Sequence, residues 1–407
     1  MASDNIALYN ALASRDPRFD GVFYVGVTST GIYCRPVCTA RTPKAANCRF
    51  FDSAEAAEKA SFRPCLRCRP ELAPGNAPVD DARRIAHLVA QRIDEGMLDD
   101  GAGLERIATR FGWSSRQIRR LVHNELGVSP MELVLTRRLL LAKQLLTDTA
   151  LSVTDVAFAS GFSSVRRFND AFVGRYSMPP SRLRSAASGT THGVATRAAH
   201  DSVLLHLTYR APFDWEELLR FLRPRTLRGV EWSDETTYHR TVQLGAHCGW
   251  LRVTHAPDKR ALVVELARGL TPVLPALLGR LRHLFDLDAR PDVIGERLAE
   301  DARLAGAVAR HPGLRIPGSF DGFDMAVRAI VGQQITVRAA TTIAGRIASA
   351  FGEAITTPFA SLTHRSPGAE RIARASVDEI ARHGIIRTRA QSLIALAGEV
   401  AEGHLRL

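Results

Sequence analysis

Residues 30–41 have the sequence TGIYCRPVCTAR, and residues 62–68 have the sequence FRPCLRC. Each stretch holds two cysteines close together, and 26 residues separate the two pairs. In a chain without a secretion signal, paired short spacings favour metal binding over disulfides. Four thiolates in tetrahedral geometry suit zinc, and such a site closes a small domain that lacks a large core. The sequence therefore predicts one Zn²⁺ ion bound by Cys34, Cys38, Cys65 and Cys68.

Two further cysteines are expected to be ordinary thiols. Cys48 lies between the pairs in a short stretch typical of a strand, Asn47–Phe51, so we expect it to be packed rather than to bind metal. Cys248 stands alone in the second half of the chain, where a buried, unreactive cysteine is the simplest interpretation.

Composition and charge favour a nucleic-acid partner. The chain has 407 residues, 45% of them apolar, which excludes wholesale disorder. Its 54 Lys and Arg against 42 Asp and Glu give a net charge of +12, and a pI near 10.0 favours a polyanion such as DNA. No apolar run approaches the ~18 residues of a membrane span, and the N-terminus does not resemble a secretion signal. We expect a cytoplasmic protein with no membrane partner.

The pattern along the chain predicts a multidomain α+β protein. We expect a small four-cysteine zinc module of α/β type, an all-α domain with two helix-turn-helix units and a linker. An α/β domain and a second, partial all-α domain follow. The expected boundaries are residues 1–75, 80–185, 186–200, 201–290 and 291–407.

Two segments of the all-α domain carry a helix-turn-helix spacing. In the first, Ala108 lets two helices touch, Gly112 makes the turn and Ile118 anchors the second helix. The second segment repeats this with Ala157, Gly161 and Phe168. Serines suited to helix N-caps follow each turn, and residues 104–184 carry 13 Arg and Lys against six Asp and Glu. A helical bundle with solvated arginines is the alternative. The candidate DNA-binding residues are Arg116, Arg119, Arg120, Ser164, Arg166 and Arg167.

The two cysteine-containing stretches, with their flanking residues, resemble the N-terminal domain of the Ada family of alkylation sensors. The resemblance covers about the first 75 residues. It implies that Cys34 is both a zinc ligand and the acceptor of a methyl group from DNA methylphosphotriesters, and that Thr30, Arg41 and Arg63 contact the DNA backbone. Zinc holds Cys34 as a thiolate at neutral pH. Methylation changes the charge of the zinc–thiolate cluster from −2 to −1, and we expect this change to strengthen specific DNA binding. A purely structural zinc site is the alternative.

The all-α domain resembles the AraC family of DNA-binding domains over about Gly103–Arg184. The matching residues are Gly-Val-Ser-Pro at 127–130, Arg-Arg-Leu-Leu-Leu-Ala at 137–142 and Ser-Gly-Phe-Ser-Ser at 160–164. The resemblance implies two helices that enter successive major-groove segments as a monomer. A glycine is usual in the family where this chain has Ser177, which leaves the local turn geometry open but not the assignment.

From about Leu204 the chain resembles the AlkA family of alkylbase DNA glycosylases. The strongest match runs from Asp321 through Gly332-Gln333-Gln334 to Ala340. The resemblance implies a small α/β domain followed by a helix-hairpin-helix domain, and an enzyme that flips a damaged base out of the duplex, with Gln334 at the wedge that fills the gap. The Leu-Pro-Gly-Ile-Gly hairpin and the catalytic aspartate of the family are not found in residues 1–407. Base excision is therefore expected to be lost or weak in this chain, which would be either truncated or a relic in this half.

These expectations define a DNA alkylation damage response protein. Cys34 acts as a stoichiometric methylphosphotriester methyltransferase, and the helix-turn-helix domain activates transcription from promoter DNA. Double-stranded DNA is the expected partner, and an activator is also expected to contact RNA polymerase. Two alternatives stay open: an active DNA-3-methyladenine glycosylase of the AlkA type, and an AraC-type regulator whose zinc is only structural.

Overall fold

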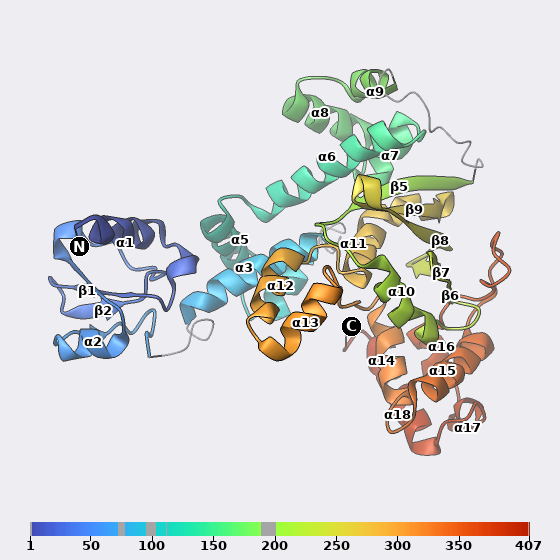
Figure 1. The fold of residues 1–407 in the computed structure, drawn as a ribbon. Helices are drawn as coiled ribbons and strands as arrows, with labels where there is room; N and C mark the ends of the chain where they lie inside the picture. Colours follow the sequence, from blue (N-terminus) through green and yellow to red (C-terminus); the bar gives the residue numbers. More distant parts are fainter. Residues whose placement is uncertain (1, 72–77, 95–102, 111, 189–200, 406) are drawn as a thin grey trace. The chain divides into compact units, whose positions relative to one another are not determined.

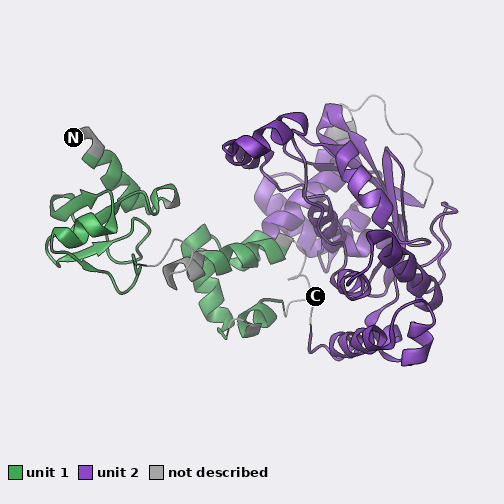
Figure 2. Cartoon of the chain, turned by 60° about the horizontal axis from the view of Figure 1, so that its bottom comes forward, with its two compact units in different colours: residues 1–93, 97–134 green, residues 94–96, 135–407 purple. Residues whose placement is uncertain are grey.

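The computed structural model of the chain describes residues 2–71, 78–94, 103–110, 112–188, 201–405 and 407 (Figure 1). The chain folds into two compact units, which Figure 2 distinguishes by colour. Unit 1 comprises residues 1–93 and 97–134, and unit 2 comprises residues 94–96 and 135–407. The multidomain α+β architecture is confirmed.

Unit 1 begins with a small mixed sheet that has the strand order β3-β1-β2-β4. Only the β2–β4 pair is parallel, and the two pairs that involve β1 are antiparallel. Gly26 is required in the sheet, because a Cβ atom there would lie 2.8 Å from Phe51 and 2.9 Å from Phe62. The elements are α1 (Ala2–Ser14), β1 (Tyr24–Val27), β2 (Ile32–Cys34), β3 (Cys48–Phe51), α2 (Ala54–Lys59) and β4 (Arg63–Pro64).

The rest of unit 1 is helical and contains the first helix-turn-helix. Its helices are α3 (Pro78–Asp94), α4 (Gly103–Arg110), α5 (Ser115–Leu126) and the start of α6 (Pro130–Asp148). Ser114 caps α5 in a capping box with Gln117, as the serine pattern predicts. Gly112 makes the turn with φ +66°, and Ile118 is fully buried against the preceding helices.

The second helix-turn-helix belongs to unit 2. Its helices are the remainder of α6, α7 (Val153–Ala159), α8 (Val165–Tyr176) and α9 (Pro180–Ser188). Ser164 caps α8, and Phe168 and Phe172 of α8 are fully buried. The expected linker at 186–200 was wrong at its first residues, because α9 continues to Ser188. Residues 189–200 of that linker lie outside the described residues.

A five-stranded antiparallel sheet forms the centre of unit 2, with the order β5-β9-β8-β7-β6. The sequence predicts a strand over Ser202–Tyr209 and a hairpin of Trp250–Thr254 with Ala261–Leu266, and these correspond to β5, β8 and β9. It does not predict β6 or β7, because seven of the eight residues of β7 are buried or half-buried and no polar alternation marks that strand. The elements are β5 (Ser202–Thr208), α10 (Trp215–Leu222), β6 (Glu231–Ser233), β7 (Thr237–Leu244), β8 (His247–Ala256), β9 (Ala261–Ala267) and α11 (Leu274–Leu284).

The C-terminal part of unit 2 is helical, as expected. The loop Gly332–Thr336 interrupts it between α14 and α15, where the Gly-Gln-Gln sequence lies. The helices are α12 (Pro291–Ala299), α13 (Ala302–Arg310), α14 (Gly322–Val331), α15 (Val337–Phe351), α16 (Ala369–Ala373), α17 (Val377–Ala381) and α18 (Arg387–Ala401). Short 3-10 helices are η1 (Pro17–Phe19), η2 (Ala45–Asn47), η3 (Arg223–Arg225), η4 (Pro257–Lys259) and η5 (Arg268–Val273). Among the described residues, no helix has the length and apolar character that crossing a bilayer requires.

Candidate metal centre and nucleic-acid interface

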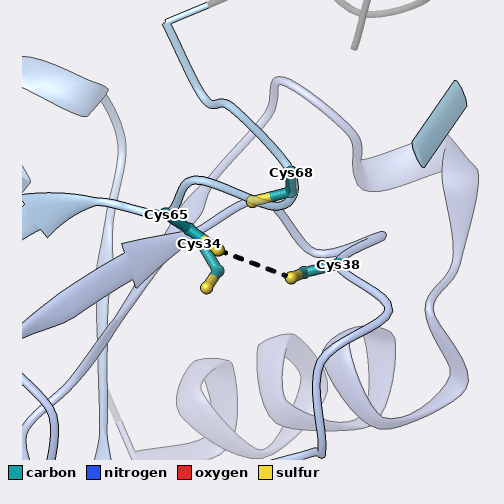
Figure 3. Close-up of side chains that lie close together, drawn as sticks. All are labelled: Cys34, Cys38, Cys65 and Cys68. Carbon is teal, nitrogen blue, oxygen red and sulfur yellow. Dashed lines mark hydrogen bonds between the residues drawn. The ribbon is translucent and has the colours of Figure 1, made fainter. Parts of the chain in front are cut away.

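The parallel pairing of β2 and β4 brings the two cysteine pairs together. Tyr33 lies opposite Pro64 in this pair, and the backbone N–H of Cys65 donates to the carbonyl of Tyr33 at 3.0 Å. The four Sγ atoms all lie within 4.8 Å of one another, and those of Cys38 and Cys65 are 4.0 Å apart (Figure 3). Tetrahedral zinc–thiolate geometry requires sulfur–sulfur distances of roughly 3.8 Å. The cluster therefore fits one zinc ion.

The thiols of this cluster perturb one another strongly. A hydrogen bond with Cys38 is the main cause that raises the pKa of Cys34, and the same contact lowers the pKa of Cys38 to about 2. One thiol therefore ionises at the expense of its neighbour. A divalent cation removes this conflict, since it stabilises all four sulfur atoms as thiolates.

Cys68 is the innermost ligand of the cluster. It is fully buried, and its Sγ accepts the backbone N–H of Arg35 at 3.4 Å. The Arg35 side chain is also buried: its Nε donates to Asp20 at 2.8 Å, and its Nη1 donates to the carbonyl of Cys68 at 3.4 Å. Cys68 is therefore held inside the fold.

A cavity of about 170 Å³ lies beside the other three cysteines. Thr30, Arg41 and Cys34 line it, so three residues predicted from the sequence share one cavity. Arg63 is not part of the lining. Arg63 lies on β4, which pairs with β2, and its backbone N–H donates to the carbonyl of Gly31 at 2.9 Å. The side chains of Thr30, Cys34 and Arg41 thus converge on the cavity, whereas Arg63 lies on β4 and does not line it.

The helix-turn-helix residues are divided between the two units. Arg116, Arg119 and Arg120 lie exposed on α5 of unit 1. On α8 of unit 2, Arg166 and Arg167 are exposed and Ser164 is half-buried as the N-cap. An ion pair at 4.0 Å links Arg166 to Asp170 in the same helix. These placements leave the arginines available to a polyanion, and their base and phosphate contacts stay predictions.

The structure settles two points about single residues. Ser177, where the family usually has glycine, adopts φ +53°, the same left-handed region as Gly127 at φ +75° in the first helix-turn-helix. Its N–H caps α8 by donating to Val173 at 2.8 Å, so the turn is preserved. The expectation that Cys248 is buried was wrong, because it is exposed at the start of β8, directly after the β7–β8 turn.

A larger cavity of about 410 Å³ lies in unit 2 among the sheet, α10, α14 and α15. Phe221, Arg225 and Phe320 contribute to its wall, and so does Ile335 of the loop between α14 and α15. Gln334, the predicted wedge residue, precedes Ile335 and is exposed with φ +57°, a conformation that favours glycine. The loop that carries Gln334 therefore borders the cavity.

A buried ionic network that the sequence did not predict lies in the wall of this larger cavity. Arg328 of α14 donates to Glu231 of β6 at 2.6 Å, and Arg240 of β7 lies 3.3 Å from the same carboxylate. Burial alone would raise the pKa of Glu231, but the two guanidinium groups outweigh it and lower the pKa to about 2. The spacing of Asp324 and Arg328 on one helix face was a sequence signal for an ion pair. The other residues of the network lie on β6 and β7, the two strands that the sequence did not predict.

Asp214, Glu217 and His311 form a second group of possible metal ligands. The Nδ1 atom of His311 lies 3.4 Å from Asp214 and 3.6 Å from Glu217. Asp214 also caps α10, and Glu217 pairs with Arg220 at 2.7 Å. These contacts join the start of α10 to the end of α13 without a metal.

Comparisons with known proteins match three segments of the chain to known families. Residues 7–71 match the family described as the metal binding domain of Ada, residues 107–186 match a helix-turn-helix domain, and residues 204–321 match the AlkA N-terminal domain. A Mycobacterium tuberculosis protein named "Probable bifunctional transcriptional activator/DNA repair enzyme AlkA" is 36% identical over all of this chain and 80% of its own length.

Two further relatives each cover part of the chain. The DNA-3-methyladenine glycosylase 2 of Escherichia coli is 34% identical over 49% of this chain and 68% of its own length. The solved structure of the E. coli Ada protein in complex with DNA is 30% identical, covers 32% of this chain and 91% of its own, and has a TM-score of 0.23.

Proposed function

The chain belongs to the family of bifunctional transcriptional activators and DNA repair enzymes that join Ada-type and AlkA-type domains. From this premise we propose the following functions for its residues. The protein acts in the response to DNA alkylation. Its four cysteines bind one Zn²⁺. Cys34 takes a methyl group from a DNA methylphosphotriester, and the methylated protein activates transcription.

The observation that carries this proposal is the cavity shared by Thr30, Arg41 and Cys34. In the proposed transfer, the Cys34 thiolate attacks the methyl carbon. A sulfur–carbon bond forms, the carbon–oxygen bond breaks, and the oxygen keeps the electron pair, which leaves an ordinary phosphodiester. Bound zinc keeps the sulfur atoms ionised at neutral pH. Because the thioether has no route back to a thiol, each protein reacts once.

The choice of Cys34 rests on burial and on the family resemblance together. Cys68 is fully buried and does not line the cavity, so it is a poor acceptor. Cys34, Cys38 and Cys65 all line the cavity, and among these three the resemblance selects Cys34. Thr30, Arg41 and Arg63 are proposed to hold the DNA backbone at its mouth.

Methylation is proposed to act as an electrostatic switch. Four thiolates around Zn²⁺ carry a charge of −2, and loss of one thiolate reduces it to −1. A less negative cluster repels the phosphates of DNA less. Specific binding by α5 and α8 therefore strengthens, through Arg116, Arg119 and Arg120 on α5 and the arginines of α8.

The remaining assignments follow from these proposed roles in methyl transfer and DNA binding. We propose the domain boundaries 1–75, 80–188, 201–290 and 291–407, with a linker between the second and third domains. Double-stranded DNA is the partner, and RNA polymerase is proposed as the second partner of the activated protein. Since its substrate is chromosomal DNA, the cytoplasm is the proposed location.

Intact-mass measurement after reaction with an oligonucleotide that carries a methylphosphotriester tests the transfer. A gain of one methyl group that peptide mapping places on Cys34, and its loss in Cys34→Ser, is the expected result. Cys248→Ser is the matched control, because Cys248 is exposed and lies in unit 2. A zinc-loaded protein that stays unmodified would refute the transfer and favour a regulator with structural zinc.

A second activity, removal of alkylated bases, is favoured by the 410 Å³ cavity. The loop that carries Gln334 borders this cavity, so a base displaced by the wedge would enter beside it. The reaction to test is the release of 3-methyladenine, which we expect to be weak or lost, because the catalytic aspartate of the family is not found in residues 1–407. Chromatographic detection of the free base from methylated DNA tests it, and a Gln334→Ala protein that retains full activity would exclude the wedge role.

A further inference from the structure

The loop Thr39–Pro43, which carries Arg41, has no regular secondary structure, yet side chains from outside hold it at three carbonyl groups. The Tyr9 hydroxyl donates to the carbonyl of Pro43 at 3.0 Å. Arg15 Nη2 donates to the carbonyl of Ala40 at 3.3 Å, and Arg67 Nη1 donates to that of Thr39 at 3.3 Å. These bonds fix the backbone on both sides of Arg41.

Two of the three clamping residues belong to α1 or its end. Tyr9 is half-buried and packs against the cysteine cluster, and Leu12 of the same helix lines the 170 Å³ cavity. Arg15 and Arg67 are exposed, so their bonds compete with water. The half-buried bond from Tyr9 is therefore the strongest of the three.

Arg15 also has a backbone conformation that is strained for an arginine. It follows α1 with φ +51°, in the left-handed region that favours glycine. A glycine would end the helix with less strain but would leave the carbonyl of Ala40 without its guanidinium partner.

We propose that Tyr9 is a positioning residue for methyl transfer: its hydroxyl holds the loop Thr39–Pro43 so that Arg41 meets the DNA backbone at the mouth of the cavity. Arg15 assists from the end of α1. The inference deepens the proposed function and rests on it. Tyr9 acts through Arg41, since phosphate contacts set the register of DNA on a protein.

The test is a double-mutant cycle on the zinc-loaded full chain, with the methylphosphotriester oligonucleotide as substrate in single-turnover reactions. Tyr9→Phe keeps the ring and removes one hydrogen bond. We expect the half-saturating DNA concentration to rise about fivefold, the usual effect of one such bond, with an unchanged limiting rate. In an Arg41→Gln background, Tyr9→Phe should have no further effect. Equal effects of Tyr9→Phe in both backgrounds would overturn the proposal.

Three measurements separate positioning from simple loss of structure. Iodomethane methylates the thiolate without DNA, so its reaction with Tyr9→Phe should keep the unaltered rate, and a slower reaction would contradict the proposal. Tyr24→Phe is the matched control, because Tyr24 packs on Tyr33 and should leave the DNA dependence unchanged. Arg15→Gly should keep or raise thermal stability while it weakens use of DNA. If the unaltered chain gains no methyl group, the proposed function fails; if it reacts and Tyr9→Phe matches it, only this inference fails.

Discussion

Replacing Glu231 by glutamine removes the central charge of the buried network in unit 2. The carboxylate lies 2.6 Å from Arg328 and 3.3 Å from Arg240, and its pKa falls from an ordinary value of 4.5 to about 2. That lowering corresponds to about 3 kcal/mol of stabilisation above pH 4.5. Breaking a buried ion pair from one side costs about 3–5 kcal/mol, so the two arguments agree.

Urea unfolding followed by tryptophan fluorescence measures this effect, because three of the four tryptophans lie in unit 2. With a denaturant slope of about 3 kcal/mol per molar, Glu231→Gln should lower the midpoint by about 1 M. The difference should shrink as the pH falls from 4.5 towards 2, since the unaltered carboxylate then becomes protonated. Glu235→Gln is the control, because its exposed pair with Arg223 should contribute under about 1 kcal/mol. Equal midpoints for Glu231→Gln and Glu235→Gln would refute the reasoning.

Three further perturbations test other parts of the chain. Removing zinc with a chelator should unfold the sheet of unit 1 and leave unit 2 folded. Amide hydrogen exchange would show this as lost protection in β1 to β3. Retained protection in these strands would contradict a folding role for the metal. Ser177→Gly should stabilise unit 2 by roughly 1 kcal/mol, because glycine adopts φ +53° without strain; an unchanged or lower unfolding midpoint would contradict this. Gln334→Ala should weaken binding to a duplex with one extruded base about tenfold but leave binding to intact duplex unchanged, and equal losses on both in a fluorescence anisotropy titration would argue against a wedge.

Local signals determined the helix-turn-helix units and the zinc module. Gly112 and Gly161 mark the turns, and both adopt the left-handed conformation. Ser114 and Ser164 cap the helices that follow, as their positions predict. A cap or a tight turn depends on a few neighbouring residues, so it can be read from a short stretch of sequence. Each cysteine pair is local in the same way, whereas the pairing of β2 with β4 brings the two pairs together.

Other features depended on contacts between distant residues. The strand β7 escaped prediction because half-buried or buried positions on both faces leave no alternating pattern, and β6 has only three residues, too few for a pattern to be recognised. The network around Glu231 lies on these strands, so its position was concealed as well.

The sequence by itself therefore determined that four cysteines bind a metal, that two basic helices follow tight turns and which families the segments resemble. Only the tertiary structure decided that Thr30, Arg41 and Cys34 share a cavity, that Tyr9 holds the loop of Arg41 and that Arg240 and Arg328 enclose a buried carboxylate. The physical reason is how far apart in the sequence the interacting residues lie. Ligand spacing, caps and turns are local, whereas a cavity or a buried ion pair forms only when the packing of the whole chain removes water from between residues far apart in sequence.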